Sequence, residues 1–432
     1  MLTPEQEAAG RRNFLKILAG TPALVALGAA ATTRGPVPGG PVRVGFIGVG
    51  GQGRVLLTQT AIGAVPTGYA EIKALADINP DSLKRATEQL QNNKHAPVPT
   101  YADWQEMLQK EDIEAVIMAP PLWAHADIAV GCLDARKHVL CEKMMAWDIE
   151  GCERMQRAAA ASNRVLEIGY QRNYNALYEA AFQGVFQKGV LGDIYLSRIL
   201  WHRNGNWRRQ GQPPSPDYDP SKWGYPTFEH LLNWRLYWKY SKGLFAELAS
   251  HQLNITNQVF GATPEAVTAS GGVFRFNDGR EAYDHVYATF EYPGGRTAVF
   301  SSIESNAFDD YYEMYMGTKG TLILRREIDA MLFAEGNSES PTGLEVTARG
   351  NGPVIDASET QAANRSGAVQ SQGPNGRTLV DRSESTRRQI RGFCSAIRVG
   401  TPLATGADKA LSSARASIRA HEAVAAKTRL TV

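Results

Sequence analysis

Residues 42–53 read VRVGFIGVGGQG, a β-rich apolar run followed directly by glycines at GxGxxG spacing. In a strand–turn–helix unit, the first glycine permits a tight turn and the second lets the backbone approach a pyrophosphate. The third allows the helix to pack close to the strand. Backbone N–H groups at the start of the helix then hold the anion. The pattern predicts a dinucleotide-binding loop whose cofactor contacts come from Gly48, Gly50, Gln52 and Gly53.

An acidic residue follows at the place that such a loop requires. Asp77 ends the next apolar run, residues 72–77, and lies 24 residues after Gly53. A carboxylate there can bond the ribose hydroxyls of the cofactor and repels a 2′-phosphate. The sequence therefore favours NAD, while Lys84 and Arg85 nearby keep NADP as an alternative.

Further apolar runs alternate with helical patterns in the first part of the chain. The runs at 115–119, 138–143 and 164–169 are nearly continuous, as expected of strands buried on both faces. Strands that alternate with helices predict a parallel, doubly wound sheet. We therefore predict an α/β fold with a Rossmann domain at 42–168.

After Tyr170 the pattern becomes that of antiparallel strands separated by Asn-Asp-Gly and Pro-Gly-Gly turns. We predict that residues 169–432 form an α+β domain for substrate binding and oligomerisation, with a large, mainly antiparallel open sheet. Residues 336–380 are rich in Gly, Ser, Asn and Pro and are expected to be a surface excursion. The strand-like runs are 193–201, 266–276, 285–292 and 297–303.

Length and composition agree with two globular domains. The chain has 432 residues, too many for one ordinary core, and 43% of them are hydrophobic. Its 46 Lys and Arg balance 44 Asp and Glu, so charge gives no reason to expect nucleic acid or an anionic membrane as partner. The four cysteines show no CxxC spacing, and we expect them to be buried thiols.

The N-terminal segment has the pattern of an export signal. Arg11-Arg12-Asn13-Phe14-Leu15-Lys16 precedes an uncharged stretch, residues 17–33, which is too short and too rich in Gly and Thr for a transmembrane helix. Ala29-Ala30-Ala31 offers small residues for a signal peptidase. The arginine pair predicts a twin-arginine signal peptide at 1–34 and a periplasmic location. An ordinary secretory signal or a retained anchor is the alternative.

Two separate segments supply the candidate catalytic groups. Lys143 lies at the carboxyl edge of the predicted sheet, where ligands of open α/β sheets bind, and can hydrogen-bond a substrate oxygen. In the predicted helix at 243–254, Glu247, His251 and Asn254 share one face. A His beside a carboxylate titrates near neutrality and can accept a hydroxyl proton. No metal is predicted, because a third His or Cys is lacking. A solvated Lys143 and a His251 satisfied within the core are the structural alternatives.

Together these motifs resemble the Gfo/Idh/MocA superfamily, which includes glucose–fructose oxidoreductase and inositol dehydrogenase. In that family, the lysine of a Glu-Lys-Pro motif and a later histidine act on a sugar hydroxyl while nicotinamide takes the hydride. The resemblance implies these roles for Lys143 and His251, with Glu247 beside them. It also implies cofactor contacts from Pro120, His125 and Glu142. The matching segments, within 42–330 and 385–430, are Gly48–Gly53, Pro120–His125, Cys141–Lys143, Gly169–Arg172, Glu247–Asn254 and Gly317–Gly320.

The chain departs from the family pattern within these motifs. Met144 replaces the proline, Glu247 and Asn254 stand where Asp is usual, and Ala249 stands where Gly is usual. A longer carboxylate at 247 moves a substrate contact, so the resemblance does not transfer a particular substrate. Side chains suited to stacking on a sugar or bonding it are Tyr170, Arg172, Trp234, Arg235 and Asn254.

Export and a nicotinamide cofactor together constrain the function. Free nicotinamide nucleotide is not expected outside the cytosol, whereas a twin-arginine route carries folded holo-protein, so the cofactor is expected to stay bound and to be recycled. The first hypothesis is an NAD(P)-dependent oxidoreductase acting on a sugar or glycoside hydroxyl. The second is an NAD-dependent glycosidase that works by transient oxidation, elimination, addition and re-reduction. The third is a cofactor-binding sensor with inert Lys143 and His251. The expected partners are a small carbohydrate and further copies of the chain, bound through the second-domain sheet.

Overall fold

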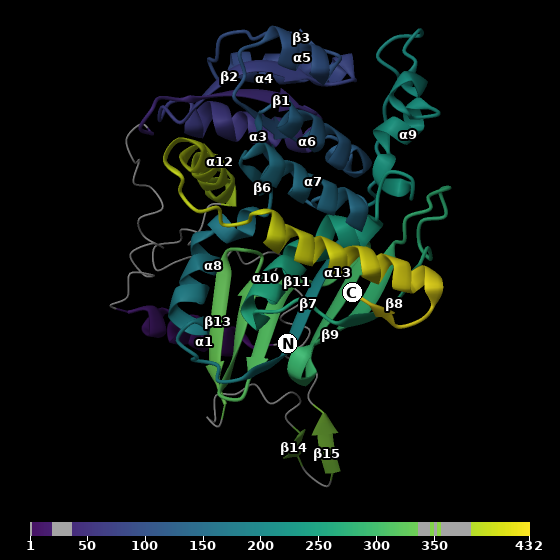
Figure 1. Cartoon of the computed structure of the whole chain (residues 1–432). Coiled ribbons are helices and arrows are strands. Elements are labelled where there is room, and N and C mark those ends of the chain that lie inside the picture. Colours follow the sequence, from purple (N-terminus) through teal and green to yellow (C-terminus); the bar gives the residue numbers. More distant parts are fainter. Residues whose placement is uncertain (1, 20–36, 336–345, 350–351, 356–381) are drawn as a thin grey trace. The chain divides into compact units, whose positions relative to one another are not determined.

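The computed structural model describes residues 2–19, 37–335, 346–349, 352–355 and 382–432 (Figure 1). The chain divides into two compact units, each assembled from three separate segments. Unit 1 comprises 1–31, 175–199 and 311–382, and unit 2 comprises 32–174, 200–310 and 383–432. Every predicted site residue belongs to unit 2.

Unit 2 contains a six-stranded parallel sheet in the order β3-β2-β1-β4-β5-β6. The order runs outward from a central β1, as in doubly wound folds, and confirms the α/β fold class. The strands are β1 (Val42–Ile47), β2 (Ala70–Ala76), β3 (Thr100–Tyr101), β4 (Ala115–Met118), β5 (His138–Cys141) and β6 (Leu166–Ile168).

Helices cover both faces of this sheet, which explains the nearly continuous apolar runs of β4 and β5. One face packs against α3 (Gly51–Gln59), α4 (Pro80–Asn92) and α12 (Arg382–Val399). The other packs against α5 (Trp104–Lys110), α6 (His125–Asp134) and α7 (Ile149–Ser162). Helix α12 comes from the end of the chain, and Ile390, Phe393 and Cys394 fill the core of the first sheet.

The second sheet has eight strands, in the order β13-β12-β11-β7-β10-β9-β8-β16. Its described pairs are antiparallel, which confirms the predicted mainly antiparallel sheet. Both β7 and β11 contribute residues to each unit. The strands are β7 (Ile194–Asn204), β8 (Ala266–Gly272), β9 (His285–Tyr292), β10 (Arg296–Ile303), β11 (Ser305–Gly317), β12 (Gly320–Arg325), β13 (Asp329–Ala334) and β16 (Leu430–Thr431).

The helix predicted at 243–254 has two parts. A π-helical turn, η7 (Phe245–Ala249), leads directly into α10 (Ser250–Phe260). Gly261 ends the helix with a left-handed φ of 61°. Helix α13 (Ala407–Ala426) packs against α10, α7 and β8 and holds this helix in place (Figure 1).

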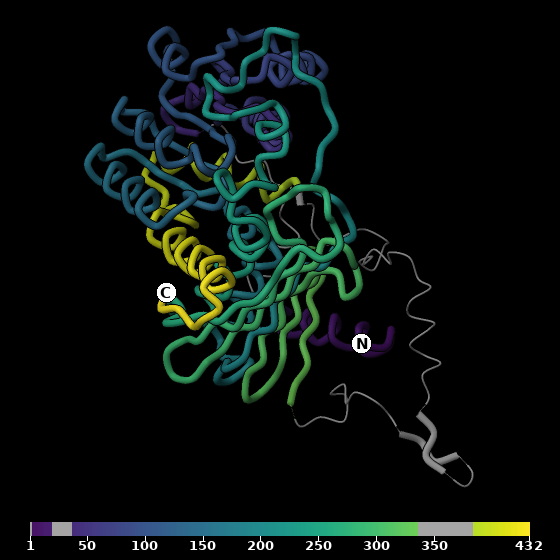
Figure 2. The backbone as a smooth tube through the Cα atoms, turned by 90° about the vertical axis from the view of Figure 1, so that its right-hand side faces the viewer, coloured from purple at the N-terminus to yellow at the C-terminus, as the bar shows by residue number. Residues whose placement is uncertain are grey.

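The remaining elements are short, and the path of the chain through them can be followed in Figure 2. They comprise η1 (Thr60–Ala64), η2 (Leu122–Ala124), η3 (Gln171–Tyr174), α8 (Ala176–Ala181), η4 (Phe182–Phe186), η5 (Pro220–Trp223), α9 (Phe228–Leu232), η6 (Trp234–Leu236) and η8 (Pro293–Gly295). Of the excursion predicted at 336–380, only the antiparallel pair β14 (Val346–Arg349) and β15 (Gly352–Ile355) lies within the described residues.

The segment predicted to be an export signal begins with a helix that packs within unit 1. Helix α1 (Pro4–Leu18) lies against β13 and buries Phe14 and Leu18, which are 1% and 0% exposed. Arg11 donates to the buried Asp329 at 2.8 Å and to Glu7 at 2.7 Å. A signal peptide was not expected to form part of the fold, whereas α1 packs within unit 1. Ala29–Ala31 lies outside the described residues.

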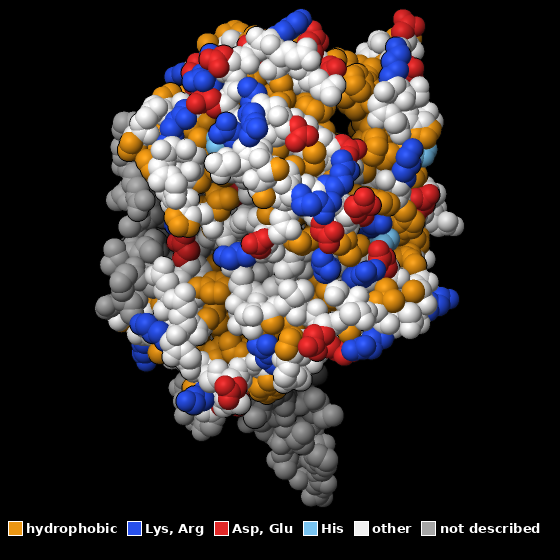
Figure 3. Space-filling view, in the orientation of Figure 1, with side chains coloured by type: hydrophobic (Ala, Val, Ile, Leu, Met, Phe, Trp, Pro, Cys, Tyr) orange, Lys and Arg blue, Asp and Glu red, His pale blue; other side chains and the backbone are white. Residues whose placement is uncertain are grey.

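All four cysteines are buried, as predicted. Within the described ranges, no helix is both long and apolar enough to cross a membrane. The same ranges hold no cluster of three His, Cys, Asp or Glu arranged for a metal ion. On the face shown in Figure 3, basic and acidic side chains are interspersed.

Replacing Phe14 with Ala tests whether α1 is part of the folded protein. Loss of this buried ring should lower the free energy of unfolding of unit 1 by about 3–5 kcal/mol. Arg12, on the exposed side of the same helix, provides the control, because Arg12→Ala removes no buried contact. Urea unfolding of the two variants would measure the difference, and equal stabilities would show that α1 does not pack as described.

Candidate functional site

The glycine loop between β1 and α3 has the geometry of a dinucleotide cradle. Gly48 has a left-handed φ of +78°, and a Cβ on Gly53 would lie 1.9 Å from the Gly48 carbonyl oxygen. At Gly50, in contrast, a Cβ would meet no atom within 4 Å. The backbone at the start of α3 is therefore open to an anion, and the loop fits the pyrophosphate of NAD.

Asp77 is tied to this loop through both carboxylate oxygens. Oδ2 accepts the Val49 N–H and Oδ1 accepts the Asn79 N–H, each at 2.8 Å. Removal from water raises the pKa of Asp77 to about 6, although these two N–H groups and the charges of Arg54 and Arg85 oppose the shift. Each oxygen keeps a second lone pair for a ribose hydroxyl. Arg54 and Arg85 could also pair with the 2′-phosphate of NADP, so NADP remains the alternative cofactor.

The other predicted cofactor residues lie at the same edge of the first sheet. Gln52 donates from Nε2 to Glu142 Oε1 at 2.7 Å, and Glu142 Oε2 accepts the Lys143 N–H at 3.1 Å. Burial raises the pKa of Glu142, against the charge of Lys143 and these hydrogen bonds. The glycine loop and the end of β5 are thus directly joined.

His125 links the segments that follow β4 and β5. Its Nδ1 lies 2.9 Å from the Met144 carbonyl and its Nε2 lies 3.1 Å from the Pro120 carbonyl. Burial lowers the pKa of His125 despite these contacts, and a neutral ring donates to only one carbonyl at a time. The side chain therefore positions the backbone around Lys143, while cofactor contacts from His125 and Pro120 stay a prediction.

Three charged side chains meet where β5 ends. Lys143 Nζ donates to the Glu247 carbonyl oxygen at 3.1 Å and lies 3.7 Å from Glu247 Oε2. Arg235 donates from Nε to the same Oε2 at 3.0 Å. Burial alone would raise the pKa of Glu247, but the charges of Arg235, Lys143 and Arg203 outweigh it and hold this pKa at about 2. Glu247 is therefore a carboxylate at all ordinary pH values.

His251 is buried beside this cluster, with 7% of the residue exposed. The rings of Tyr170 and Trp201 lie 5.9 and 6.1 Å from it, between centroids. Within the described part of the chain, no group hydrogen-bonds its Nδ1. Burial, followed by the charges of Lys143 and Arg172, holds the pKa of His251 well below its usual value. The ring is therefore neutral and has an acceptor nitrogen available.

One sequence-based expectation about this pair is wrong. A neighbouring carboxylate was expected to bring the titration of His251 near neutrality, but the Glu247 carboxylate bonds Arg235 and faces Lys143. The reason lies in η7, whose i→i+5 bonding widens the helical turn, so that residues four apart do not stack as in an α-helix. The other expectation, a bond to a substrate hydroxyl, stays a prediction.

Of the predicted substrate residues other than Asn254, Tyr170 and Arg172 lie near His251 and Trp201, and Trp234 and Arg235 lie against each other. Tyr170 contacts His251, and Trp234 and Arg235 lie together, with the Arg235 guanidinium 4.2 Å above the Trp234 ring centre. Arg172 is 1% exposed and lies 5.2 Å from the centre of the Trp201 ring. Direct contact of these residues with a substrate stays a prediction.

Asn254 has the contacts of a structural residue. Its Oδ1 accepts from Asn173 at 2.8 Å, and its Nδ2 donates to the Lys409 carbonyl and to Ser413 Oγ at 3.4 Å each. The residue is 1% exposed. These bonds fix α10 against α13 and leave the predicted substrate contact without support.

Trp201 and Arg203, within residues 201–209 that read WHRNGNWRR, were not predicted to belong to the site. Trp201 contacts His251, and Arg203 donates to the buried Glu304 at 2.5 Å. Burial raises the pKa of Glu304 to about 7, against the charges of Arg203 and Arg280. The density of Arg and Trp directly after a strand was the available signal, but the partners lie far away in sequence.

Comparison with known families agrees with this geometry. Residues 42–170 match the description "Oxidoreductase family, NAD-binding Rossmann fold", and residues 180–323 match the GFO/IDH/MocA C-terminal domain. The two matches follow one another along the chain and together cover more than half of it. The chain therefore belongs to the Gfo/Idh/MocA family of oxidoreductases.

Individual relatives are distant. Myo-inositol 2-dehydrogenase of Thermotoga maritima is 23% identical over 232 residues, which cover 54% of this chain and 59% of that protein. A glycosyl hydrolase family 109 protein of Shewanella baltica is 30% identical over 231 residues, covering 46% of this chain and 50% of that protein. The chain thus spans between 50% and 59% of the length of these relatives.

Solved structures share the fold at low identity. A levoglucosan dehydrogenase in complex with NADH and levoglucosan is similar, with a TM-score of 0.66 and 19% identity over 91% of this chain and 99% of that chain. The scyllo-inositol dehydrogenase of Lactobacillus casei, with NAD(H) and scyllo-inositol, has a TM-score of 0.62 at 19% identity, over 90% of this chain and 99% of that one.

The raised pKa of Asp77 predicts a pH dependence of cofactor binding. Below about pH 6 the carboxyl of the free protein is protonated, and it loses acceptor capacity for the ribose. Affinity for NAD should therefore fall several-fold, at most about tenfold per pH unit, as the pH is lowered through this value. Titration calorimetry from about pH 7.5 to 5 would measure it, with Asp77→Asn as the control, whose affinity should change little with pH. A wild-type affinity that is also flat would contradict the ribose assignment.

Proposed function

We propose that the protein is an NAD-dependent oxidoreductase that oxidises a hydroxyl of a sugar or related polyol. The observation that carries the proposal is the free Nδ1 of the buried, neutral His251 next to the Lys143–Glu247 pair. A buried nitrogen without a partner costs about 1–3 kcal/mol, and such groups in native proteins call for a specific explanation. A substrate hydroxyl that donates to Nδ1 supplies one.

In this reaction His251 accepts the hydroxyl proton. Its low pKa makes it a weak base toward an alcohol, but the proton becomes strongly acidic as the carbon loses hydride and a carbonyl forms. Transfer of this proton to the imidazole therefore becomes favourable once the hydride has largely left the carbon. Bound NAD supplies the hydride acceptor.

Lys143 and Glu247 act on the same substrate region. The Lys143 ammonium hydrogen-bonds the reacting oxygen and favours its negative character. Glu247, fixed as a carboxylate by Arg235, accepts a bond from a neighbouring hydroxyl. A polyol, which presents adjacent hydroxyls, matches this pair of a cationic donor and an anionic acceptor.

The names of the relatives support this substrate class. Inositol, scyllo-inositol and levoglucosan, named with the related dehydrogenases, are ring polyols or anhydrosugars. The glycosyl hydrolase family 109 relative keeps a glycosidase as the second candidate. The products distinguish the candidates: a keto-sugar, a hydrolysed glycoside, or neither for a sensor.

Substitution of the two proposed catalytic residues tests the reaction. His251→Ala and Lys143→Ala should each slow hydride transfer by about 10²–10⁴ while leaving NAD affinity nearly unchanged, because neither residue belongs to the glycine loop. The measurement is single-turnover reduction of bound NAD by a panel of polyols, sugars and glycosides.

His230→Ala is the matched control, because His230 is a partly exposed histidine on α9 that stacks on Tyr237. It should retain the wild-type rate. Near wild-type rates in both catalytic variants would eliminate the assignment and favour the sensor hypothesis.

We further propose that the protein is exported by the twin-arginine route with its cofactor bound, and that it assembles into a homo-oligomer through the second sheet. The Arg11–Arg12 pair and the following Phe14, Leu15 and Lys16 support export. For recognition, Arg11 must leave its ion pairs with Glu7 and Asp329. Docked α1 and export-competent α1 are therefore two alternative states of one segment.

Export makes a prediction about location and cofactor together. Arg11→Lys combined with Arg12→Lys should retain the protein in the cytosol, whereas wild-type protein from the periplasm should release NAD(H) when it is denatured. Fractionation followed by nucleotide chromatography would show both. Periplasmic accumulation of the double variant, or exported protein without nucleotide, would contradict the corresponding half of the proposal.

A further inference from the structure

Residues 205–227, between β7 and α9, cross the edge of the first sheet where the dinucleotide is expected; we call this segment the strap. Its sequence, GNWRRQGQPPSPDYDPSKWGYPT, contains five prolines, which restrict its backbone. The strap touches the segments that follow three adjacent strands, β2, β1 and β4. Dinucleotides bind in the crevice outside these strand ends.

Two contacts fix the strap across the crevice. The Tyr218 hydroxyl donates to the Ile78 carbonyl at 3.0 Å, directly after β2 and next to Asp77. The Tyr225 hydroxyl accepts the Trp123 Nε1–H at 2.7 Å, in the segment that follows β4. Tyr225 is 2% exposed, so this end is firmly packed.

Between these contacts, Arg209 reaches the glycine loop. Its Nη2 lies 3.7 Å from the point where a Cβ on Gly51 would stand, at the first residue of α3. The charges that act on it include those of Arg54 and Arg235, so the guanidinium lies between the cradle and the catalytic cluster. Although much of Arg209 is exposed, no described group forms a hydrogen bond or ion pair with its guanidinium.

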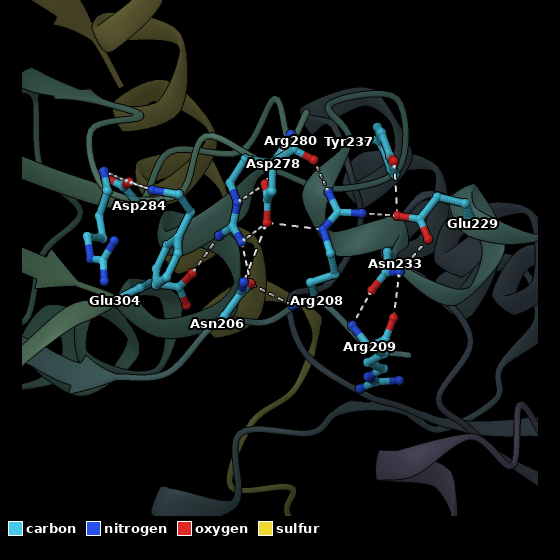
Figure 4. A network of polar contacts seen from close by, with 12 residues as sticks. Asn206, Arg208, Arg209, Glu229, Asn233, Tyr237, Asp278, Arg280, Asp284 and Glu304 are labelled. Atoms are coloured by element: carbon cyan, nitrogen blue, oxygen red, sulfur yellow. Dashed lines mark hydrogen bonds and ion pairs between the residues drawn. The ribbon is translucent and has the colours of Figure 1, made fainter. Parts of the chain in front are cut away.

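The backbone of Arg209 is rigidly held, as Figure 4 shows. Its N–H donates to Asn233 Oδ1 at 2.6 Å and its carbonyl accepts from Asn233 Nδ2 at 3.1 Å. The neighbouring Arg208 bonds Asp278 at 3.0 Å and also pairs with Glu229. The Arg208 side chain thus anchors the strap, whereas the Arg209 guanidinium can bind a ligand.

We propose that the strap closes over the bound dinucleotide, with Arg209 bonding the pyrophosphate from the side opposite the glycine loop and Tyr218 covering the adenosine ribose. The proposal rests on the proposed NAD-dependent function and names the residues that retain the cofactor. A guanidinium bonds two phosphate oxygens at once, which suits the diphosphate. Dissociation of the cofactor then requires the strap to detach.

The test measures release and affinity of the cofactor in the full-length protein. Protein loaded with NADH is mixed with excess NAD, and the loss of bound NADH fluorescence gives the release rate. Arg209→Ala should raise this rate about 10-fold to 100-fold, the usual value of a hydrogen bond to a charged group. Arg209→Lys keeps the charge but loses the fork and should give an intermediate rate. Tyr218→Phe should also accelerate release.

Competition of ADP and of adenosine against NADH shows which part of the cofactor Arg209 contacts. Arg209→Ala should weaken ADP, which carries a diphosphate, by a similar factor and leave adenosine unchanged. Gln210→Ala, an exposed neighbour in the strap, should behave as wild type in both measurements. The Lys variant preserves the test if the Ala variant does not fold.

The outcomes separate the two proposals. If wild-type protein binds no NADH, the proposed function itself fails. If it binds NADH but the Arg209 variants release NADH and bind ADP as wild type does, the strap proposal is overturned and the function stands. A changed KM for sugar with unchanged ADP affinity would place Arg209 on the substrate and also overturn the proposal.

Discussion

The contact of Lys143 with Glu247 connects the first sheet of unit 2, with its glycine loop, to the helix that carries His251. Lys143 follows β5, and Glu247 belongs to the π-helical turn before α10, about a hundred positions further along the chain. A buried carboxylate and a largely buried ammonium each carry a large desolvation cost unless they are paired. Since Arg235 also pairs with Glu247, the three charges hold α10 where His251 faces the end of the sheet. Removing one of the three charged side chains would leave an uncompensated charge in a site that is shielded from water.

Local patterns were sufficient to predict five of the six strands of the first sheet and its glycine loop, whereas the two-residue β3 was not predicted. The first two apolar runs, the GxGxxG spacing and Asp77 all lie within residues 42–77, and each follows from near-neighbour geometry. The return of α12 to this sheet was not predicted, because its apolar stripe fits any complementary core and the partner strands are more than two hundred residues away. Candidate site residues were named correctly as neighbours, since Lys143, Glu247 and His251 do meet. The expected titration of His251 near neutrality was wrong, because its pKa depends first on burial and then on the charges of Lys143 and Arg172.

Two further differences between prediction and structure arise because the contacting residues lie far away along the chain. Asn254 shares the helix of His251, yet its amide is used to bond α10 to α13, which no periodicity in α10 could reveal. In α1, the pattern of an export signal and the pattern of an amphipathic helix coincide in one segment. Its buried Phe14 and Leu18 are apolar residues that a signal also requires. In the proposed export this helix leaves β13, and Arg11 then gives up its ion pair with Asp329.

The distribution of charge around the crevice gives the bound cofactor a role in stability as well as chemistry. Arg54 and Arg235 both act on Arg209 in the direction that lowers its pKa, after burial as the larger cause, so these cations repel one another. A pyrophosphate placed among them turns repulsion into attraction, and its binding free energy adds to the stability of the folded state. The charges of Arg235, Lys143 and Arg203 hold the pKa of Glu247 at about 2 against its burial. Burial, followed by the charges of Lys143 and Arg172, holds the pKa of His251 below its usual range, so that Glu247 is ionised and His251 is neutral. An excess of positive charge in the crevice thus favours retention of an anionic dinucleotide and, a few side chains away, sets up an acceptor for the substrate proton.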